Sequence, residues 1–338
     1  MSTDPRLFEL HAFIRTCPAH LNLDLDSLAP ASADASFRRY FRLNGSANNT
    51  FIVMDAPPAQ EDCRPFITVA ELFRATGVHV PGVLAQDLEQ GFLLLDDFGQ
   101  RTYLNELTPT SVSPLYGDAI SALVKLQQGT RPDVLPHYDH NRLMHELQLF
   151  PQWYLGKHLG KSLNTEQLNT LDRMFKTIVQ VNLAEPQVYV HRDYHCRNLM
   201  IVRDNNPGII DFQDAVIGPM TYDLVSLLRD AYIQWPEPLQ IEWAIGFWTQ
   251  ARAAGLPVRA DFGEFWRDFE IMGLQRHLKI LGIFARLYHR DGKEGYLKDL
   301  PRVSHYARSV MERYRMFLPL LKILDSAEGY ARPTGYTF

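Results

Sequence analysis

Cysteine is scarce in this chain of 338 residues, and the few that occur do not form a pattern. Cys17, Cys63 and Cys196 are odd in number and widely spaced. This arrangement fits neither a disulfide framework nor a metal site of the CxxC type. We therefore expect free thiols and a reducing compartment.

Long apolar runs are absent as well. No stretch reaches the roughly 18 consecutive apolar residues of a membrane-spanning helix, and the N-terminal segment MSTDPRLFELHAFIRT carries acids at Asp4 and Glu9. The net charge of −5 gives no reason to expect nucleic acid or an anionic membrane as the main partner. The sequence favours a soluble, cytoplasmic protein, and a monomer is the favoured state.

The periodicity of the chain changes after its first hundred residues. Helical spacing predicts helices over residues 6–16 and 66–77, and strand-like runs lie at 37–43, 50–54 and, as a pair, within 81–99. From about Ser111 onward the pattern is mostly helical, with strand-like exceptions at 187–213. This predicts an α+β protein with two lobes: a small sheet-plus-helix lobe over 1–97 and a larger, mostly helical lobe over 98–338.

Three polar residues with a specific spacing interrupt the strand-like region. The segment HRDYHCRNLMIV is followed by PGIIDFQDA, so that Asp193 and Asn198 are five residues apart and Asp211 follows 13 residues later. Oxygen ligands from Asn198 and Asp211 suit Mg²⁺, and a carboxylate such as Asp193 can orient a hydroxyl and accept its proton. The pattern predicts phosphoryl transfer; a β-hairpin with polar residues at its tip is the alternative.

The sequence also lacks the activation segment of protein kinases, about 20 to 30 residues long. Only a short step separates Asp211 from the helical pattern TYDLVSLLRDAY, which favours a small-molecule substrate over a protein. We expect Asp223 to brace the catalytic loop, with a helix N-cap as an equal alternative, and His191 to have a structural role. His195 is a candidate substrate contact, or a residue that stabilises the loop through a hydrogen bond.

No lysine precedes Lys125, although kinases of this type normally hold ATP with a lysine in the small lobe. The segment DASFRRYFRL offers arginines instead, and we favour Arg39 as the phosphate contact, with a structural ion pair as the alternative. The loop ASADASF has no glycine, but Ser32 and Ser36 are candidate donors to phosphate. Asp97 is a further expected nucleotide contact.

With these residues in view, the chain resembles the aminoglycoside phosphotransferase and choline-kinase-like branch of the protein-kinase superfamily. The segments DASFRRYFRL, IVMDAPP, GFLLLDDFG and MGLQRHLKILGIFARLYHRDGK are similar to those of bacterial anomeric kinases that phosphorylate N-acetylmuramate and N-acetylglucosamine in cell-wall recycling. The resemblance implies ATP, Mg²⁺ and a sugar 1-phosphate product. A kinase of another small alcohol, such as choline, homoserine or an aminoglycoside, is the alternative, as is a pseudokinase that binds nucleotide without catalysis.

Basic residues recur along the predicted helix 264–290. Arg276 and Lys279 lie on a stripe with Arg286 and Arg290, opposite a leucine-rich stripe. We expect Arg276 or Lys279 to meet the carboxylate of N-acetylmuramate. A solvent-exposed basic face is the alternative.

Overall fold

The computed structural model describes residues 4–33, 37–46 and 49–330 of the chain. It divides into two compact units: residues 1–129 with 197–215, and residues 130–196 with 216–338. The chain thus passes between the units three times, including once inside the predicted catalytic loop. The predicted lobe boundary after residue 97 concerns functional lobes and stays a prediction.

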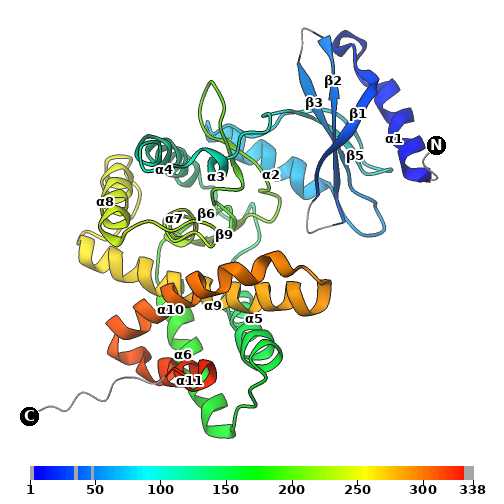
Figure 1. The fold of residues 1–338 in the computed structure, drawn as a ribbon. Helices are drawn as coiled ribbons and strands as arrows, with labels where there is room; N and C mark the ends of the chain where they lie inside the picture. Colours follow the sequence, from blue (N-terminus) through cyan, green and yellow to red (C-terminus); the bar gives the residue numbers. More distant parts are fainter. Residues whose placement is uncertain (1–3, 34–36, 47–48, 331–338) are drawn as a thin grey trace, which may run out of the picture. The chain divides into compact units, whose positions relative to one another are not determined.

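An antiparallel sheet of five strands forms the centre of the first unit (Figure 1). Its order is β1-β2-β3-β5-β4, and the strands are β1 Asp24–Ala33, β2 Arg39–Asn44, β3 Thr50–Asp55, β4 Val83–Asp87 and β5 Phe92–Asp96. The predicted hairpin of β2 and β3 and the two later strands are confirmed. The sequence analysis missed β1, because DLDSLAPASA contains a proline and no β-branched residue; β1 is an edge strand with an irregular register, where proline is tolerated.

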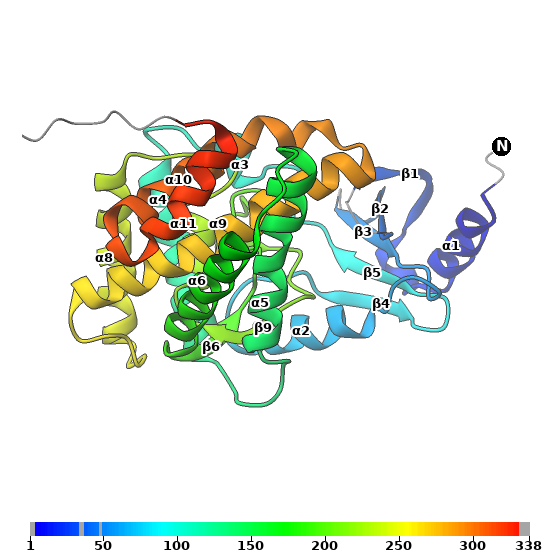
Figure 2. The ribbon, with the colours of Figure 1, turned by 90° about the horizontal axis from the view of Figure 1, so that it is seen from below.

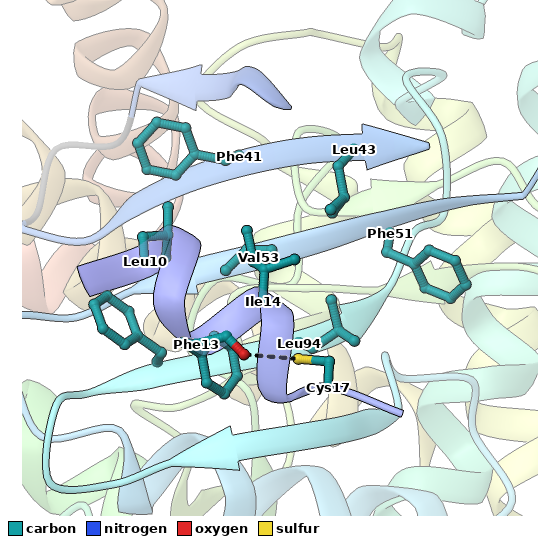
Figure 3. Packing of buried hydrophobic residues seen from close by; sticks show 10 residues of the cluster. Leu10, Phe13, Ile14, Cys17, Phe41, Leu43, Phe51, Val53 and Leu94 are labelled. Carbon is teal, nitrogen blue, oxygen red and sulfur yellow. Dashed lines mark hydrogen bonds between the residues drawn. The ribbon is translucent and has the colours of Figure 1, made fainter. Parts of the chain in front are cut away.

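Helix α1, Pro5–Thr16, covers one face of this sheet, as Figure 3 shows. Asp4 caps its N-terminus by accepting a hydrogen bond from the Arg6 backbone at 3.0 Å. Side chains alternate between the two faces of a strand, so every second residue of β2, β3 and β5 points at the helix. The cluster comprises Leu10, Phe13, Ile14 and Cys17 of the helix segment and Phe41, Leu43, Phe51, Val53, Phe92 and Leu94 of the sheet.

The rest of the first unit is helical apart from one short strand pair. Its helices are α2 Arg64–Ala75, α3 Tyr103–Glu106 and α4 Val112–Gln128, with the turn η1 Ala19–Leu21. The predicted helix over 66–77 is confirmed as α2, which is followed by Gly77 in the left-handed region at φ +88°. Strands β7 Leu199–Met200 and β8 Gly208–Ile209 pair with each other.

The second unit is mostly helical. It contains α5 His140–Leu149, the π-helix η3 Phe150–His158, α6 Thr165–Leu183, α7 Tyr222–Leu228, α8 Glu237–Ala253, α9 Phe262–Asp291, η4 Glu294–Asp299, α10 Leu300–Arg313, η5 Arg315–Phe317 and α11 Leu318–Glu328. One strand pair, β6 Gln187–Val190 with β9 Val216–Pro219, completes it. Helix α9 packs against α5, η3, α6, α7 and α10 and is the central element of this unit (Figure 2).

Helix α9 is buried around most of its circumference between Asp268 and Ala285. Arg276 and Lys279 are only 3% and 7% exposed, although they lie on the basic stripe of the sequence. A solvent-exposed basic face is therefore wrong for these two residues. Arg290, near the end of α9, is exposed as expected.

Glycine allows one of the closest contacts of α9. A Cβ atom at Gly282 would lie 2.4 Å from the backbone carbon of Leu149, where α5 continues into η3. The helix can approach this backbone only because residue 282 has no side chain. Within the described ranges, no helix is long and apolar enough to cross a membrane.

Candidate active site

Two short strands flank the loop that carries the sequence motif. Strand β6 leads into residues 191–196 of the second unit, and β7 follows residues 197–198 in the first unit. Strands at both ends of the loop were predicted, and this is confirmed. The first half of the loop carries Asp193, and the second half carries Asn198.

The backbone of the first half folds tightly around Asp193. The Asp193 amide donates to Nδ1 of His191 at 3.2 Å, and the His195 amide donates to the Asp193 carbonyl at 2.9 Å. His191 is fully buried, whereas Asp193 is half-buried. The loop therefore fixes its own backbone and leaves the Asp193 carboxylate partly accessible.

Two buried carboxylates hold this half-loop from the second unit. Asp223, in the first turn of α7, accepts hydrogen bonds from the amides of His191 at 2.6 Å and Arg192 at 3.0 Å. Asp230 accepts from the Cys196 amide at 2.9 Å. Asp223 makes the bracing contact that was weighed against an N-cap role, and the N-cap position of α7 belongs to Thr221.

The two carboxylates next to the loop backbone differ in charge state. The pKa of Asp223 is raised to about 7. Burial is the main cause and the charge of Asp193 adds to it, while the two backbone hydrogen bonds act in the opposite direction. Burial also opposes ionisation of Asp193, but the positive charges of Lys279, His195, Arg276 and Arg192 lower its pKa to about 2. Asp193 is therefore ionised at neutral pH.

A buried ion cluster lies behind the loop. Glu146 of α5 pairs with Lys279 of α9 at 3.0 Å and accepts a hydrogen bond from Arg192 at 2.8 Å. Lys279 also donates to the Tyr222 hydroxyl at 2.9 Å, and the Tyr138 hydroxyl donates to Glu146. We call these five residues the Glu146 cluster.

The Glu146 cluster restrains a backbone position that is uncommon for arginine. Arg192 has a φ of +77°, in the left-handed region that favours glycine. Such a conformation persists when the surrounding contacts determine it. Here the Arg192 amide is bound by Asp223 and its guanidinium by Glu146, so both ends of the residue next to Asp193 are fixed.

The second half of the loop brings Asn198 and Asp211 together in the first unit. The Asn198 side-chain amide donates to an Asp211 carboxylate oxygen at 3.2 Å, and Gln213 donates to the other oxygen at 2.8 Å. The Ile210 amide also donates to the Asn198 carbonyl, at 3.1 Å. Strands β7 and β8 thus hold the two predicted metal ligands side by side.

The Asn198–Asp211 pair supplies the oxygen ligands that Mg²⁺ prefers. Among the described residues, no group of three or more His, Cys, Asp or Glu side chains is placed to hold a metal. A pair of one amide and one carboxylate suits a magnesium ion that takes its other ligands from phosphate and water. Phe212 follows Asp211 and is buried against Phe66 of α2, with ring centroids 4.7 Å apart, which anchors this segment to the small lobe.

The arginines of β2 and the residue before it have separate carboxylate partners in the first unit. Arg39 binds Asp55 at 2.9 Å through Nε and also pairs with Asp4, so the structural ion pair exists. Its predicted contact with phosphate stays a prediction. Arg38 donates to Glu61 at 3.0 Å, and although burial opposes it, nearby acidic groups including Asp214 and Asp211 raise the pKa of its guanidinium.

Of the other predicted nucleotide contacts, the side chain of Asp97 is described by the structure and those of Ser32 and Ser36 are not. Asp97 accepts two hydrogen bonds from Arg42 and one from Thr50 at 2.6 Å, and these outweigh burial and lower its pKa. The backbone of Ser32 belongs to β1, opposite Tyr40, and its side chain lies outside the described part of the chain, as does all of Ser36.

The three predicted substrate contacts all lie in the second unit. His195 is 9% exposed, and its ring lies edge-on to Tyr232 with centroids 5.3 Å apart. Lys279 belongs to the Glu146 cluster. Arg276 is buried, and its Nε and Nη1 atoms have no hydrogen-bond partner.

The sequence analysis missed two of the carboxylates that support the loop. Asp230 lies seven residues after Asp223, about two helical turns, so the spacing in YDLVSLLRD was an available signal. Glu146 lies in the ordinary amphipathic pattern HNRLMHELQL of α5. Its partners lie 46 and 133 residues away along the chain, and no local pattern connects them.

Comparison with known proteins identifies relatives along nearly the whole chain. The sequence matches the model of the phosphotransferase enzyme family over residues 27–262. An N-acetylmuramate/N-acetylglucosamine kinase of Pseudomonas aeruginosa is 47% identical over 334 residues, 96% of this chain and 98% of that protein. A kinase of the same name from Neisseria meningitidis serogroup B is 44% identical over 338 residues, 98% of this chain and 99% of that protein.

The fold is shared with solved phosphotransferases. An ADP-bound aminoglycoside phosphotransferase has a TM-score of 0.58, covers 93% of this chain and 99% of its own, and is 16% identical. The predicted two-lobed protein-kinase-like fold is therefore confirmed. Because the family match spans residues 27–262 and relatives above 40% identity extend along almost the whole length, the chain belongs to the phosphotransferase enzyme family.

Proposed function

We propose that this protein transfers the γ-phosphoryl group of ATP to the anomeric hydroxyl of N-acetylmuramate and N-acetylglucosamine. The observation that carries the proposal is the state of Asp193: it is partly accessible, ionised, and fixed through the loop backbone by Asp223. The names of the relatives from Pseudomonas aeruginosa and Neisseria meningitidis support these sugars as substrates.

Asp193 acts on the acceptor hydroxyl in this proposal. Its carboxylate orients the hydroxyl and takes its proton as the oxygen forms a bond to the γ-phosphorus. The bond from that phosphorus to the β,γ-bridging oxygen breaks, and ADP leaves. The low pKa of Asp193 keeps the group ionised before the reaction, and its main contribution is orientation and late proton acceptance.

Asn198 and Asp211 hold the magnesium ion that accompanies ATP. Bound there, Mg²⁺ neutralises phosphate charge that develops during transfer. The hydrogen bond between Asn198 and Asp211, and the one from Gln213, set the orientation of the two ligand groups before the ion binds.

An arginine replaces the missing lysine, and Arg38 is the candidate that the charges favour. Arg38 pairs with Glu61, and its electrostatic neighbours also include Asp211 and Asp214, on and next to the proposed metal site. Arg39 is bound to two carboxylates, Asp4 and Asp55. A guanidinium is permanently charged and matches phosphate geometry. Arg39, Ser32, Ser36 and Asp97 remain proposed nucleotide contacts on sequence grounds.

A coupled assay of ADP release tests the proposed activity. With Mg²⁺-ATP, we expect the wild-type protein to turn over N-acetylglucosamine, and Asp193→Asn to lower kcat by roughly 10²- to 10⁴-fold because the general base is lost. Asp204→Asn, at an exposed carboxylate in the loop between β7 and β8, is the matched control and should retain activity. If the wild-type protein turned over neither N-acetyl sugar, the proposal would be contradicted. A kinase of another small alcohol, or a pseudokinase, would then be favoured.

A further inference from the structure

Arg276 differs from the other buried arginines of the second unit. Arg229 pairs with Glu270 at 3.0 Å, and Arg192 pairs with Glu146 at 2.8 Å. Arg276 is 3% exposed, close to Arg229 at 2%, and two of its nitrogens, Nε and Nη1, have no hydrogen-bond partner. Arg229 and Arg192 each have one such nitrogen, but both also have a carboxylate partner. The other terminal nitrogen of Arg276, Nη2, is not among the buried unsatisfied atoms.

An unpartnered buried guanidinium is costly, because its hydration is lost without compensating hydrogen bonds. Buried arginines normally have an assigned partner for this reason. The carboxylates that support the loop are already engaged, since Asp223 binds the loop backbone and Glu146 binds Arg192 and Lys279. The hydrogen-bonding capacity of Arg276 is thus left for a group that the protein itself does not provide.

The position of Arg276 is next to the catalytic loop. Arg276 is three residues before Lys279 on α9, and Lys279 pairs with Glu146, which also binds Arg192 of the loop. Burial opposes ionisation of both Asp193 and Asp223, and the charge of Arg276 acts to lower the pKa of each. Arg192 and Lys279 share the carboxylate of Glu146, whereas Arg276 has no such ion pair among the described residues.

We infer that Arg276 binds the carboxylate of an acidic sugar acceptor and thereby sets the preference for acidic over neutral amino sugars. The inference rests on the proposed function and extends it. N-acetylmuramate is N-acetylglucosamine with an added lactyl ether, so the two acceptors differ in charge by the one carboxylate of the lactyl group. A guanidinium fork matches a carboxylate in a way that the neutral sugar cannot use.

The test compares the two sugars in each variant. Arg276→Gln should lower kcat/KM for N-acetylmuramate relative to N-acetylglucosamine by roughly 10- to 100-fold, since one charge-assisted contact is lost. Any effect on Asp193 acts on both sugars and cancels in the ratio. Arg276→Lys keeps the charge but lacks the guanidinium fork, so its kcat/KM ratio should lie between those of the wild type and Arg276→Gln. In both variants the loss should appear mainly as a higher KM for the acidic sugar.

Arg286→Gln is the matched control, because Arg286 lies on the same helix and its Nε is also buried without a partner, but the charges that act on it are those of Arg290 and Asp291. Its sugar ratio should equal that of the wild type. An unchanged ratio in Arg276→Gln, or a changed ratio in Arg286→Gln alone, would overturn the inference.

A substrate-side probe needs no folded variant. The wild-type protein should use the lactyl amide of N-acetylmuramate with a kcat/KM reduced by roughly 10- to 100-fold relative to the acid. Equal use of amide and acid would also overturn the role of Arg276. Because N-acetylglucosamine turnover is measured in the same series, failure of this inference is distinguishable from failure of the proposed function, in which neither sugar is a substrate.

Discussion

At the scale of single residues, the site depends on buried charged groups that look like ordinary surface residues of a helix in the sequence. Lys279 is on a basic stripe in the sequence, but in the fold it is 7% exposed and paired with Glu146. Removing one partner of a buried pair leaves an uncompensated charge, whereas removing a partner from a surface pair has little effect. The lysines of this protein allow that difference to be measured directly.

We expect Lys279→Met to lower the free energy of unfolding by about 3–5 kcal/mol, measured by urea denaturation. The control is Lys176→Met: Lys176 makes a pair of similar length with Asp172, 2.8 Å, but is 61% exposed, so its loss should cost less than about 1 kcal/mol. Equal losses in the two variants would show that Glu146 is compensated by Arg192 alone.

The sequence predicts those residues of the site that follow one another at a characteristic spacing. Asp193, Asn198 and Asp211 follow one another within HRDYHCRNLMIV and PGIIDFQDA, and the structure gives the last two a shared hydrogen bond. Glu146 and the orphaned nitrogens of Arg276 were not predictable, because burial and pairing depend on how α5, α9 and the loop pack in three dimensions.

At the scale of elements, helix α9 organises the second unit by packing closely against several neighbours. Its predicted extent, 264–290, is close to the observed Phe262–Asp291, because a long hydrophobic periodicity is a strong signal. Which of its faces reach solvent was not predictable from that periodicity. Polar residues appear on every face, and several of them are buried by contacts from other elements.

Gly282→Ala should destabilise the protein by about 1–3 kcal/mol, because its Cβ would lie 2.4 Å from the backbone of Leu149 and α9 would have to shift. In Gly246→Ala the same substitution is made inside α8, where an added Cβ would have no atom within 4 Å, and the better helix propensity of alanine should stabilise by up to about 1 kcal/mol. Thermal unfolding of both variants checks the opposite signs. Stabilisation by Gly282→Ala would contradict the close approach.

The strands show where local pattern is sufficient and where it is not. Alternating apolar residues on either side of Asn44-Gly45-Ser46 predicted β2 and β3. The edge strand β1 has neither alternation nor β-branched residues, and it exists because β2 offers it a partner along residues 39–44. Its last residues, from Ala31, belong to the segment ASADASF that the sequence predicts as a phosphate loop.

At the scale of the whole molecule, the protein has a kinase-like fold in which the segment between Asp211 and α7 is short. Only ten residues lie between Asp211 and Tyr222, where α7 begins, and four of them form β9. A protein kinase would use this position for an activation segment. This short connection supports the proposed small-molecule acceptor, and the relatives' names are those of amino-sugar kinases.

The measurement that tests the central claim most directly is phosphoryl transfer to N-acetylglucosamine and to its 1-deoxy analogue, with saturating Mg²⁺-ATP and ADP release as the readout. The 1-deoxy sugar keeps every hydroxyl except the anomeric one. Transfer to the anomeric oxygen predicts turnover of N-acetylglucosamine and none of the analogue. Turnover of the analogue at a comparable rate would contradict anomeric phosphorylation, because another hydroxyl would then be the acceptor.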